Sequence, residues 1–173
     1  MRPSRDQTGI DLAAVWARRG TCPRRRVGCV LFDADGYQLA DGYNGVAAGL
    51  PHCTDHPCPG AGLLSGSGLD RCEAIHAEAA ALLRCPDVRL IHTCYVTASP
   101  CVHCVKLLLG TTCRRIVFVE EYPHPEAERL WARAGREWVR FGAPVEVCDR
   151  PNCLAPQRNP MACADRRCYE RKT

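Results

Sequence analysis

His76-Ala77-Glu78 and Pro100-Cys101-Val102-His103-Cys104 are the two segments that decide how this chain is interpreted. Together they supply one imidazole, two thiols and one carboxylate that is not needed as a ligand. Three protein ligands leave the fourth position of a tetrahedral zinc open, which is typical of a catalytic rather than a structural metal. The sequence therefore predicts a zinc site formed by His76, Cys101 and Cys104, with Glu78 beside it.

The residue types in these segments suit hydrolysis. Zinc lowers the pKa of bound water toward ~7, so that hydroxide is available at neutral pH. Glu78 is expected to take the proton from that water and to deliver it to the substrate and its leaving group. We expect a helix over 74–85 with His76 in its first turn. A second helix over about 101–110, with Pro100 at its start, would aim Cys101 and Cys104 at one ion.

A structural zinc site is the alternative interpretation of the same segments. In that case Glu78 would be a solvated helix residue, and His103 would be a competing ligand in place of His76. The combination of H-x-E with P-C-x-x-C favours the catalytic interpretation, because this combination is the signature of zinc-dependent nucleobase deaminases.

Composition places the chain among ordinary globular proteins. It has 173 residues, of which 46% are hydrophobic and 24% charged, and this suits one compact domain with extensions. No run of ~18 apolar residues predicts a membrane helix, and the segment from Met1 to Asp6 lacks the apolar region of a signal peptide. We therefore expect a cytoplasmic protein. In that compartment its 14 cysteines indicate metal binding rather than disulfides.

Positive charge is concentrated near the N-terminus. The net charge is only +4, but five arginines lie within one short stretch: Arg18, Arg19, Arg24, Arg25 and Arg26. Such a cluster suits the phosphate of a nucleotide or of a nucleic acid. A solvated basic surface is the alternative.

Hydrophobic periodicity predicts strands that alternate with helices after an opening hairpin. This order indicates an α/β fold with a mixed sheet, and the metal ligands are expected at helix starts just beyond strand ends. The expected helices cover 8–19, 74–85, 101–110 and 125–134, and the expected strands cover 27–32, 37–43, 95–97, 115–119 and 145–148.

With these residues placed, the chain resembles the deoxycytidylate (dCMP) deaminases of the cytidine deaminase superfamily, including the phage and bacterial competence-operon forms. The resemblance implies a three-layer α/β/α fold and zinc-dependent hydrolysis of dCMP to dUMP and ammonia. It also implies a homo-oligomer with dCTP and dTTP as effectors. A deaminase domain would cover 1–147, with an insert over about 46–72, and a basic tail would cover 148–173. The matching segments are Cys22–Cys29, Gly42-Tyr43-Asn44-Gly45, His52-Cys53, Cys72, Ile75–Glu78, Tyr95-Val96-Thr97 and Ser99–Cys101 with Cys104.

The resemblance also implies substrate contacts at matching positions. These are the side chain of Asn44 near the sugar, the backbone at Ala77 and around Ala98 and Ser99, the ring of Tyr122, and an arginine for the phosphate. Arg26 is the first candidate for that arginine, ahead of Arg84 and Arg89.

Two departures from the family pattern leave the substrate open. Ala80 stands where the family has an asparagine, and Val46-Ala47-Ala48 follows Gly45 where the family has a proline. A modified cytosine nucleotide, a nucleoside, or a base in tRNA or single-stranded DNA are the alternative substrates. A zinc-stabilised nucleic-acid-binding module without turnover is the alternative outside enzymes, and Glu78 argues against it.

The remaining cysteines suggest further zinc. The resemblance implies a second, structural zinc held by Cys22, Cys53, Cys58 and Cys72, with His52 and His56 as competing ligands. Beyond the family match, the C-x4-C pairs of the tail suggest a third zinc held by Cys148, Cys153, Cys163 and Cys168, or else unused thiols. The apolar neighbours of Cys29, Cys85, Cys94 and Cys113 predict packing positions.

Overall fold

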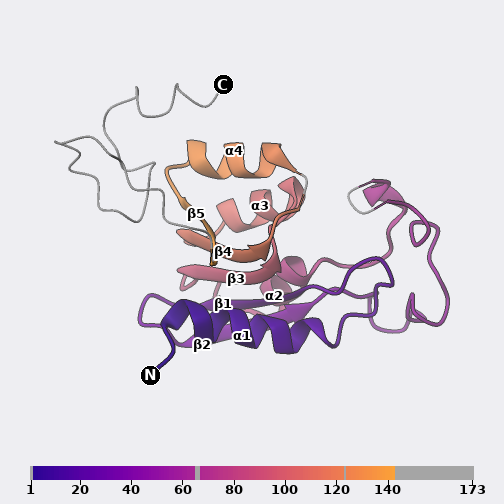
Figure 1. The fold of residues 1–173 in the computed structure, drawn as a ribbon, viewed down its shortest axis with the longest axis horizontal. Helices are drawn as coiled ribbons and strands as arrows, with labels where there is room; N and C mark the ends of the chain where they lie inside the picture. Colours follow the sequence, from indigo (N-terminus) through magenta and orange to yellow (C-terminus); the bar gives the residue numbers. More distant parts are fainter. Residues whose placement is uncertain (1, 65–66, 123, 143–173) are drawn as a thin grey trace. The chain divides into compact units, whose positions relative to one another are not determined.

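A mixed sheet organises the computed structural model, which describes residues 2–64, 67–122 and 124–142. The strand order is β2-β1-β3-β4-β5, with β1 antiparallel to β2 and β3 and the last three strands parallel (Figure 1). In chain order the elements are α1 Arg5–Ala17, β1 Gly28–Phe32, β2 Gln38–Tyr43, a 3-10 turn Leu69–Arg71, α2 Ala77–Arg84, β3 Thr93–Ala98, α3 Val102–Leu109, β4 Arg115–Glu120, α4 Pro125–Arg133 and β5 Glu137–Arg140.

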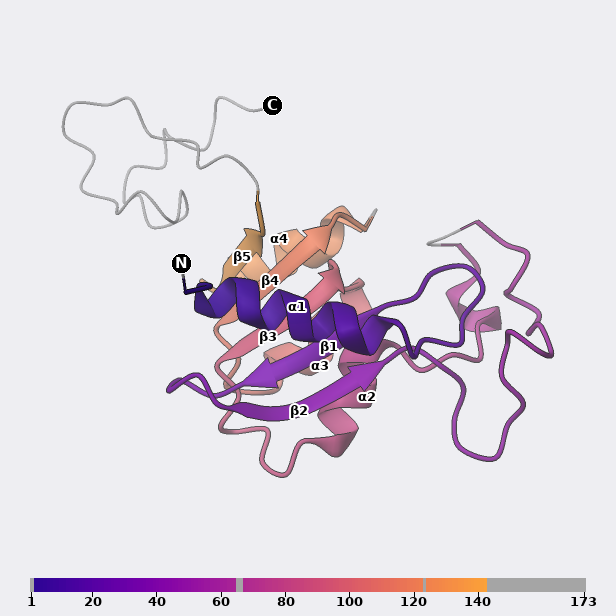
Figure 2. The same ribbon diagram turned by 60° about the horizontal axis from the view of Figure 1, so that its bottom comes forward.

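Side chains that alternate along the strands point to opposite faces of the sheet, and each face carries its own hydrophobic core. Val30, Tyr95 and Val117 pack against Ile10 and Ala13 of α1. Their neighbours along the same strands pack in the larger core with residues of α2, α3 and α4. Figure 2 shows α1 in front of the strands. The predicted three-layer α/β/α class is therefore confirmed.

The predicted elements agree with the structure except at their ends and near the C-terminus. Helix α1 begins earlier than expected, because the Ser4 hydroxyl caps it by accepting a hydrogen bond of 3.0 Å from the Gln7 amide. Strand β5 was not predicted. The strand expected over 145–148 and the whole proposed tail lie outside the described residues. None of the described helices is long and apolar enough to cross a membrane.

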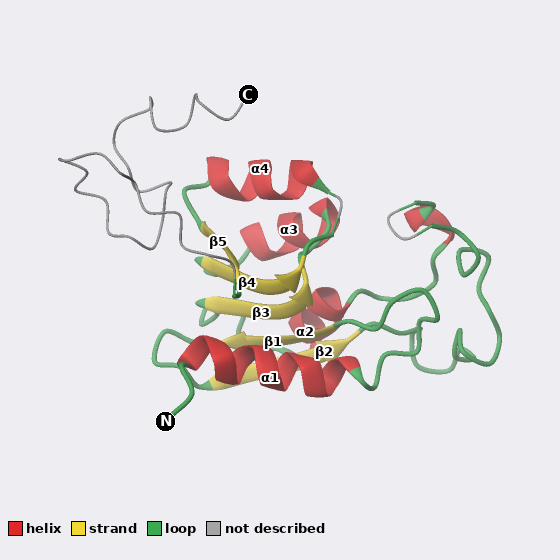
Figure 3. Cartoon of the chain, in the orientation of Figure 1, coloured by secondary structure: helices red, strands yellow, loops and turns green. Residues whose placement is uncertain are grey.

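The insert between β2 and α2 is mostly loop, as expected (Figure 3). It is closed at its base by a bridge between Gly45 and Ile75, whose amides and carbonyls exchange hydrogen bonds of 3.2 and 2.8 Å. Since Ile75 directly precedes His76, this bridge fixes the chain where α2 begins.

Gly42 lets α2 lie directly on the sheet. A Cβ atom at this position would overlap the carbonyl oxygen of Ala77 and the amide nitrogen of Ala81, both in the backbone of α2. The close approach of helix and strand therefore requires glycine, and it sets the position of the helix that carries Glu78.

Replacing Gly42 with alanine should destabilise the protein by about 1–3 kcal/mol, because α2 must move away from β2. The free energy of unfolding in urea measures the effect. Gly62→Ala is the matched control, because a Cβ atom there would meet nothing within 4 Å. A Gly42→Ala protein that unfolds at the wild-type midpoint would show that α2 does not depend on this contact.

Candidate metal centre and active site

His76, Cys101 and Cys104 come together in the folded chain, and their ligand atoms all lie within 4.8 Å of one another. The Nδ1 atom of His76 is 3.4 Å from Sγ of Cys101 and 3.5 Å from Sγ of Cys104. Tetrahedral zinc with ordinary Zn–N and Zn–S bonds needs a nitrogen–sulfur separation of about 3.5 Å. The three side chains therefore fit one zinc ion. His103 is exposed and is not part of this cluster.

The ends of two helices position these ligands. His76 is the N-cap of α2 and Cys101 is the N-cap of α3, and both have extended backbones. The expectation that His76 lies in the first turn and that Pro100 begins the second helix was therefore wrong. Helix α2 begins at Ala77, three residues after the expected start at 74, and α3 begins at Val102, two residues after Pro100. The N-cap position lets each side chain face the gap between the helices, where the positive ends of the helix dipoles favour thiolate.

The thiol groups of the cluster differ in acidity. The hydrogen bond with Cys104, together with the one to His76, lowers the pKa of Cys101 to about 3. The bond with Cys101, together with burial, raises the pKa of Cys104. The bond to Cys101 also raises the pKa of His76 against the effect of burial.

Glu78 lies beside the cluster without belonging to it. It is the second residue of α2, and only 3% of it is exposed. Burial raises the pKa of its carboxyl group, while the positive charge of His76 acts in the opposite direction. A buried carboxyl of this kind can both accept and release a proton, as a general acid–base group must.

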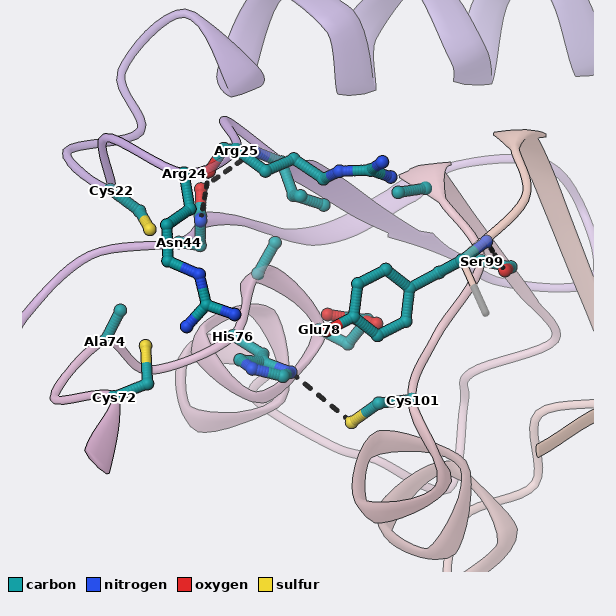
Figure 4. A pocket seen from close by; sticks show the side chains of 14 residues that line it. Cys22, Arg24, Arg25, Asn44, Cys72, Ala74, His76, Glu78, Ser99 and Cys101 are labelled. Carbon is teal, nitrogen blue, oxygen red and sulfur yellow. Dashed lines mark hydrogen bonds between the residues drawn. The ribbon is translucent and has the colours of Figure 1, made fainter. Parts of the chain in front are cut away.

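A pocket opens onto Glu78 and onto two of the three proposed metal ligands, His76 and Cys101 (Figure 4). Five of the predicted substrate contacts line it: Asn44, Ala77, Ala98, Ser99 and Tyr122. Arg26 does not line it and is exposed. The arginines in the wall are its neighbours Arg24 and Arg25, which the sequence marked only as members of a basic cluster.

Asn44 and Ser99 hold the walls of this pocket. The Asn44 side chain accepts a hydrogen bond of 2.8 Å from the Val27 amide and donates one of 2.7 Å to the Arg25 carbonyl. The Ser99 hydroxyl accepts a bond of 2.7 Å from the Tyr122 amide. Both side chains are therefore engaged in positioning neighbouring pocket residues, a role that the sequence did not indicate.

Residues 3–120 match the family model described as the cytidine and deoxycytidylate deaminase zinc-binding region. The chain belongs to this family. The deoxycytidylate deaminase of Mycobacterium phage D29 is 38% identical over 126 residues, which are 69% of this chain and 98% of the phage protein. ComE operon protein 2 of Bacillus subtilis is 36% identical over 69% of this chain and 61% of its own length. The predicted resemblance to phage and competence-operon deaminases is thus confirmed.

A solved structure supports the same fold. The dCMP deaminase from cyanophage S-TIM5, in its apo form, superposes with a TM-score of 0.64 and 20% identity, over 82% of this chain and 100% of that protein. This likeness shows the fold.

In the present chain, the four cysteines proposed for a second zinc lie near one another. The thiols of Cys53 and Cys58 are hydrogen-bonded, and Cys22 interacts electrostatically with both Cys53 and Cys72. Outside the His76 cluster, however, the described residues place no other three such ligand atoms within 4.8 Å of one another. His52 and His56 are exposed, whereas Cys53 and Cys58 are buried.

The cysteines predicted to pack are in the core with one exception. Cys29, Cys94 and Cys113 are fully buried, while Cys85 is half-buried at the end of α2. The four cysteines of the proposed third zinc, Cys148, Cys153, Cys163 and Cys168, lie outside the described residues.

Proposed function

We propose that this protein is a zinc-dependent deaminase that hydrolyses dCMP to dUMP and ammonia. The observation that carries the proposal is a three-ligand zinc cluster with a buried carboxylate, Glu78, that stands beside it in a pocket. A structural zinc site needs a fourth protein ligand and has no use for such a carboxylate.

The roles of the residues follow from this arrangement. His76, Cys101 and Cys104 would hold the zinc, which supplies an activated water when bound. Glu78 accepts the proton of the water that attacks C4 of the cytosine ring, and it then delivers protons to the ring and to the leaving ammonia. The backbone at Ala77 and Ser99 and the side chains of Asn44 and Tyr122 are proposed to bind the substrate.

The relatives support a deoxycytidine nucleotide as substrate. Proteins named deoxycytidylate deaminase include the phage relative, which the chain covers almost completely, and the fission yeast relative, of which it covers 38%. The cyanophage enzyme has been solved in complex with dCMP and dUMP. Arginines in the pocket wall of the present chain suit a phosphate.

An ammonia-release assay on the zinc-loaded protein tests this function. The panel compares dCMP with CMP, 5-substituted dCMP, deoxycytidine and short DNA and RNA oligonucleotides. We expect the highest kcat/KM with dCMP. A preference for a 5-substituted nucleotide would indicate that the replacement of asparagine by Ala80 changes the substrate. A preference for an oligonucleotide would indicate that the substrate is a base in nucleic acid. No ammonia from any of them would contradict the enzyme proposal.

We also propose a second, structural zinc held by Cys22, Cys53, Cys58 and Cys72. The burial of Cys22, Cys53 and Cys58 and the interactions among the four cysteines support it. Four thiolates would stabilise an insert that has little core of its own. From the family resemblance we propose a homo-oligomer that dCTP and dTTP regulate, and from the sequence alone we propose a cytoplasmic location.

A further inference from the structure

Two side chains lie against the ring of Tyr122 in the pocket wall, and they come from distant parts of the chain. The imidazole of His124 stacks on the ring, with the two centroids 5.1 Å apart and the planes inclined by 17°. The guanidinium of Arg25 lies over the same ring, with Cζ 5.6 Å from the centroid. Both distances are in the range of favourable ring contacts. His124 does not itself line the pocket, so its influence on the pocket would pass through Tyr122.

His124 occupies a position at which other residue types stabilise a fold better. It is the N-cap of α4, where Ser, Thr, Asp and Asn are preferred because their side chains accept hydrogen bonds from the first helical amides. The His124 side chain makes no such bond. Its Nε2 atom is also buried without a hydrogen-bond partner among the described residues, which costs folding free energy. The stacking on Tyr122 is the contact that this histidine makes in place of a cap.

Helix α4 gives His124 a firm support. The His124 amide donates a hydrogen bond of 2.7 Å to the Tyr122 carbonyl, and its own carbonyl accepts one of 2.9 Å from the Ala127 amide. Ala127 and Trp131 are fully buried, and the Trp131 indole donates a bond of 2.9 Å to the first carbonyl of β5. The Tyr122 backbone is fixed separately by the Ser99 hydroxyl. These bonds hold the backbone and leave the orientation of the Tyr122 ring to its side-chain neighbours.

Arg25 is the less firmly held of these two neighbours. Its guanidinium forms an ion pair of 3.4 Å with Glu120, whose side chain is 67% exposed. An exposed ion pair fixes the geometry of its side chains weakly. His124, whose backbone begins a buried helix, is therefore the neighbour that can hold the ring of Tyr122 in one orientation.

We infer that His124 is a positioning residue of the proposed active site, whose imidazole holds the Tyr122 ring in the orientation that packs on the nucleotide. A ring that is already fixed loses little conformational freedom when the substrate binds. Loss of the imidazole should therefore raise KM and leave kcat, which depends on Glu78 and the zinc cluster, at the wild-type value. This inference rests on the proposed deaminase function, because that function makes Tyr122 a substrate contact.

The test replaces His124 with asparagine and with phenylalanine. Asparagine removes the ring but suits an N-cap, so His124→Asn should unfold in urea at the wild-type midpoint or above it. Its KM for dCMP should rise by about 2- to 10-fold, which corresponds to the loss of one aromatic pair. Phenylalanine keeps an aromatic ring, so His124→Phe should keep the wild-type KM. Glu126→Gln changes an exposed residue in the first turn of the same helix and should alter neither quantity.

A double-mutant cycle shows whether His124 acts through Tyr122. In a Tyr122→Ala protein, whose own KM should be raised, the addition of His124→Asn should raise KM no further, because the ring that it positions is absent. The inference is wrong if KM is unchanged in His124→Asn, if it rises equally in His124→Phe, or if it rises again in the Tyr122→Ala background. A lower unfolding midpoint together with a lower kcat in His124→Asn would show that the residue only supports the fold.

A wild-type protein that releases no ammonia from dCMP would refute the proposed function instead. Calorimetric binding of dUMP to the same variants then decides about His124, since the Kd should rise in His124→Asn and stay at the wild-type value in His124→Phe. An unchanged Kd in His124→Asn, or a wild type that does not bind dUMP, would overturn the inference.

Discussion

Replacing Glu78 with glutamine is expected to abolish deamination while leaving the catalytic zinc in place. Glutamine keeps the size of the buried side chain but cannot carry a proton. General acid–base catalysis contributes about 10²- to 10⁴-fold to a rate, and Glu78 serves more than one proton transfer in the proposed mechanism. We therefore expect kcat to fall by about 10³-fold or more. Ammonia release measures the rate, and atomic absorption on the same sample measures zinc.

Glu73→Gln is the matched control, because it removes an exposed carboxylate from the segment that leads into α2. It should retain the wild-type rate. If Glu78→Gln also loses zinc, Glu78 is a ligand and its assignment as the proton carrier is wrong. If Glu78→Gln retains both zinc and turnover, another group moves the proton.

The cluster of His76, Cys101 and Cys104 could be predicted from the sequence, because short local patterns carry its residues. H-x-E and P-C-x-x-C are short patterns, and each one lies at the start of a helix with a clear apolar face. Only the helix boundaries were misplaced, since an N-cap residue such as His76 or Cys101 differs from a first-turn residue in backbone conformation alone. The hairpin of β1 and β2 could also be predicted, because a turn at Asp33–Gly36 separates the apolar run of β1 from the strand that follows.

Tertiary packing decides what the sequence could not show. Strand β5, Glu137–Arg140, is short and only half-buried, so its residues show no alternation of buried and exposed positions. The three arginines at 24–26 are identical in sequence but differ in role. Arg24 and Arg25 both line the pocket, Arg24 also donates hydrogen bonds to the insert, and Arg26 is exposed. The side chain of Asn44 holds this segment through the Val27 amide and the Arg25 carbonyl, and a turn-like Asn-Gly pair gives no sign of these bonds.

Cys101→Ala should remove the catalytic zinc and with it all measurable deamination. The variant keeps two protein ligands, His76 and Cys104, and loses one of the two thiols of the cluster. Changes even to the residues that support metal ligands cost about 10- to 100-fold in metal affinity or activity, and loss of a ligand should cost more. Zinc per chain and ammonia release are measured together.

The Cys58→Ser variant tests the proposed structural zinc site independently of the catalytic one. Cys58 belongs to the insert and not to the His76 cluster, so its loss should release the structural zinc and leave the catalytic zinc bound. Because Cys22 and Cys72 line the pocket, a loosened insert should raise KM for dCMP more than it lowers kcat. An unchanged zinc count in Cys58→Ser would refute the second zinc, whereas an unchanged count in Cys101→Ala would refute the catalytic ligand set. The two variants therefore test the two metal assignments independently, and turnover should follow the zinc bound by His76, Cys101 and Cys104.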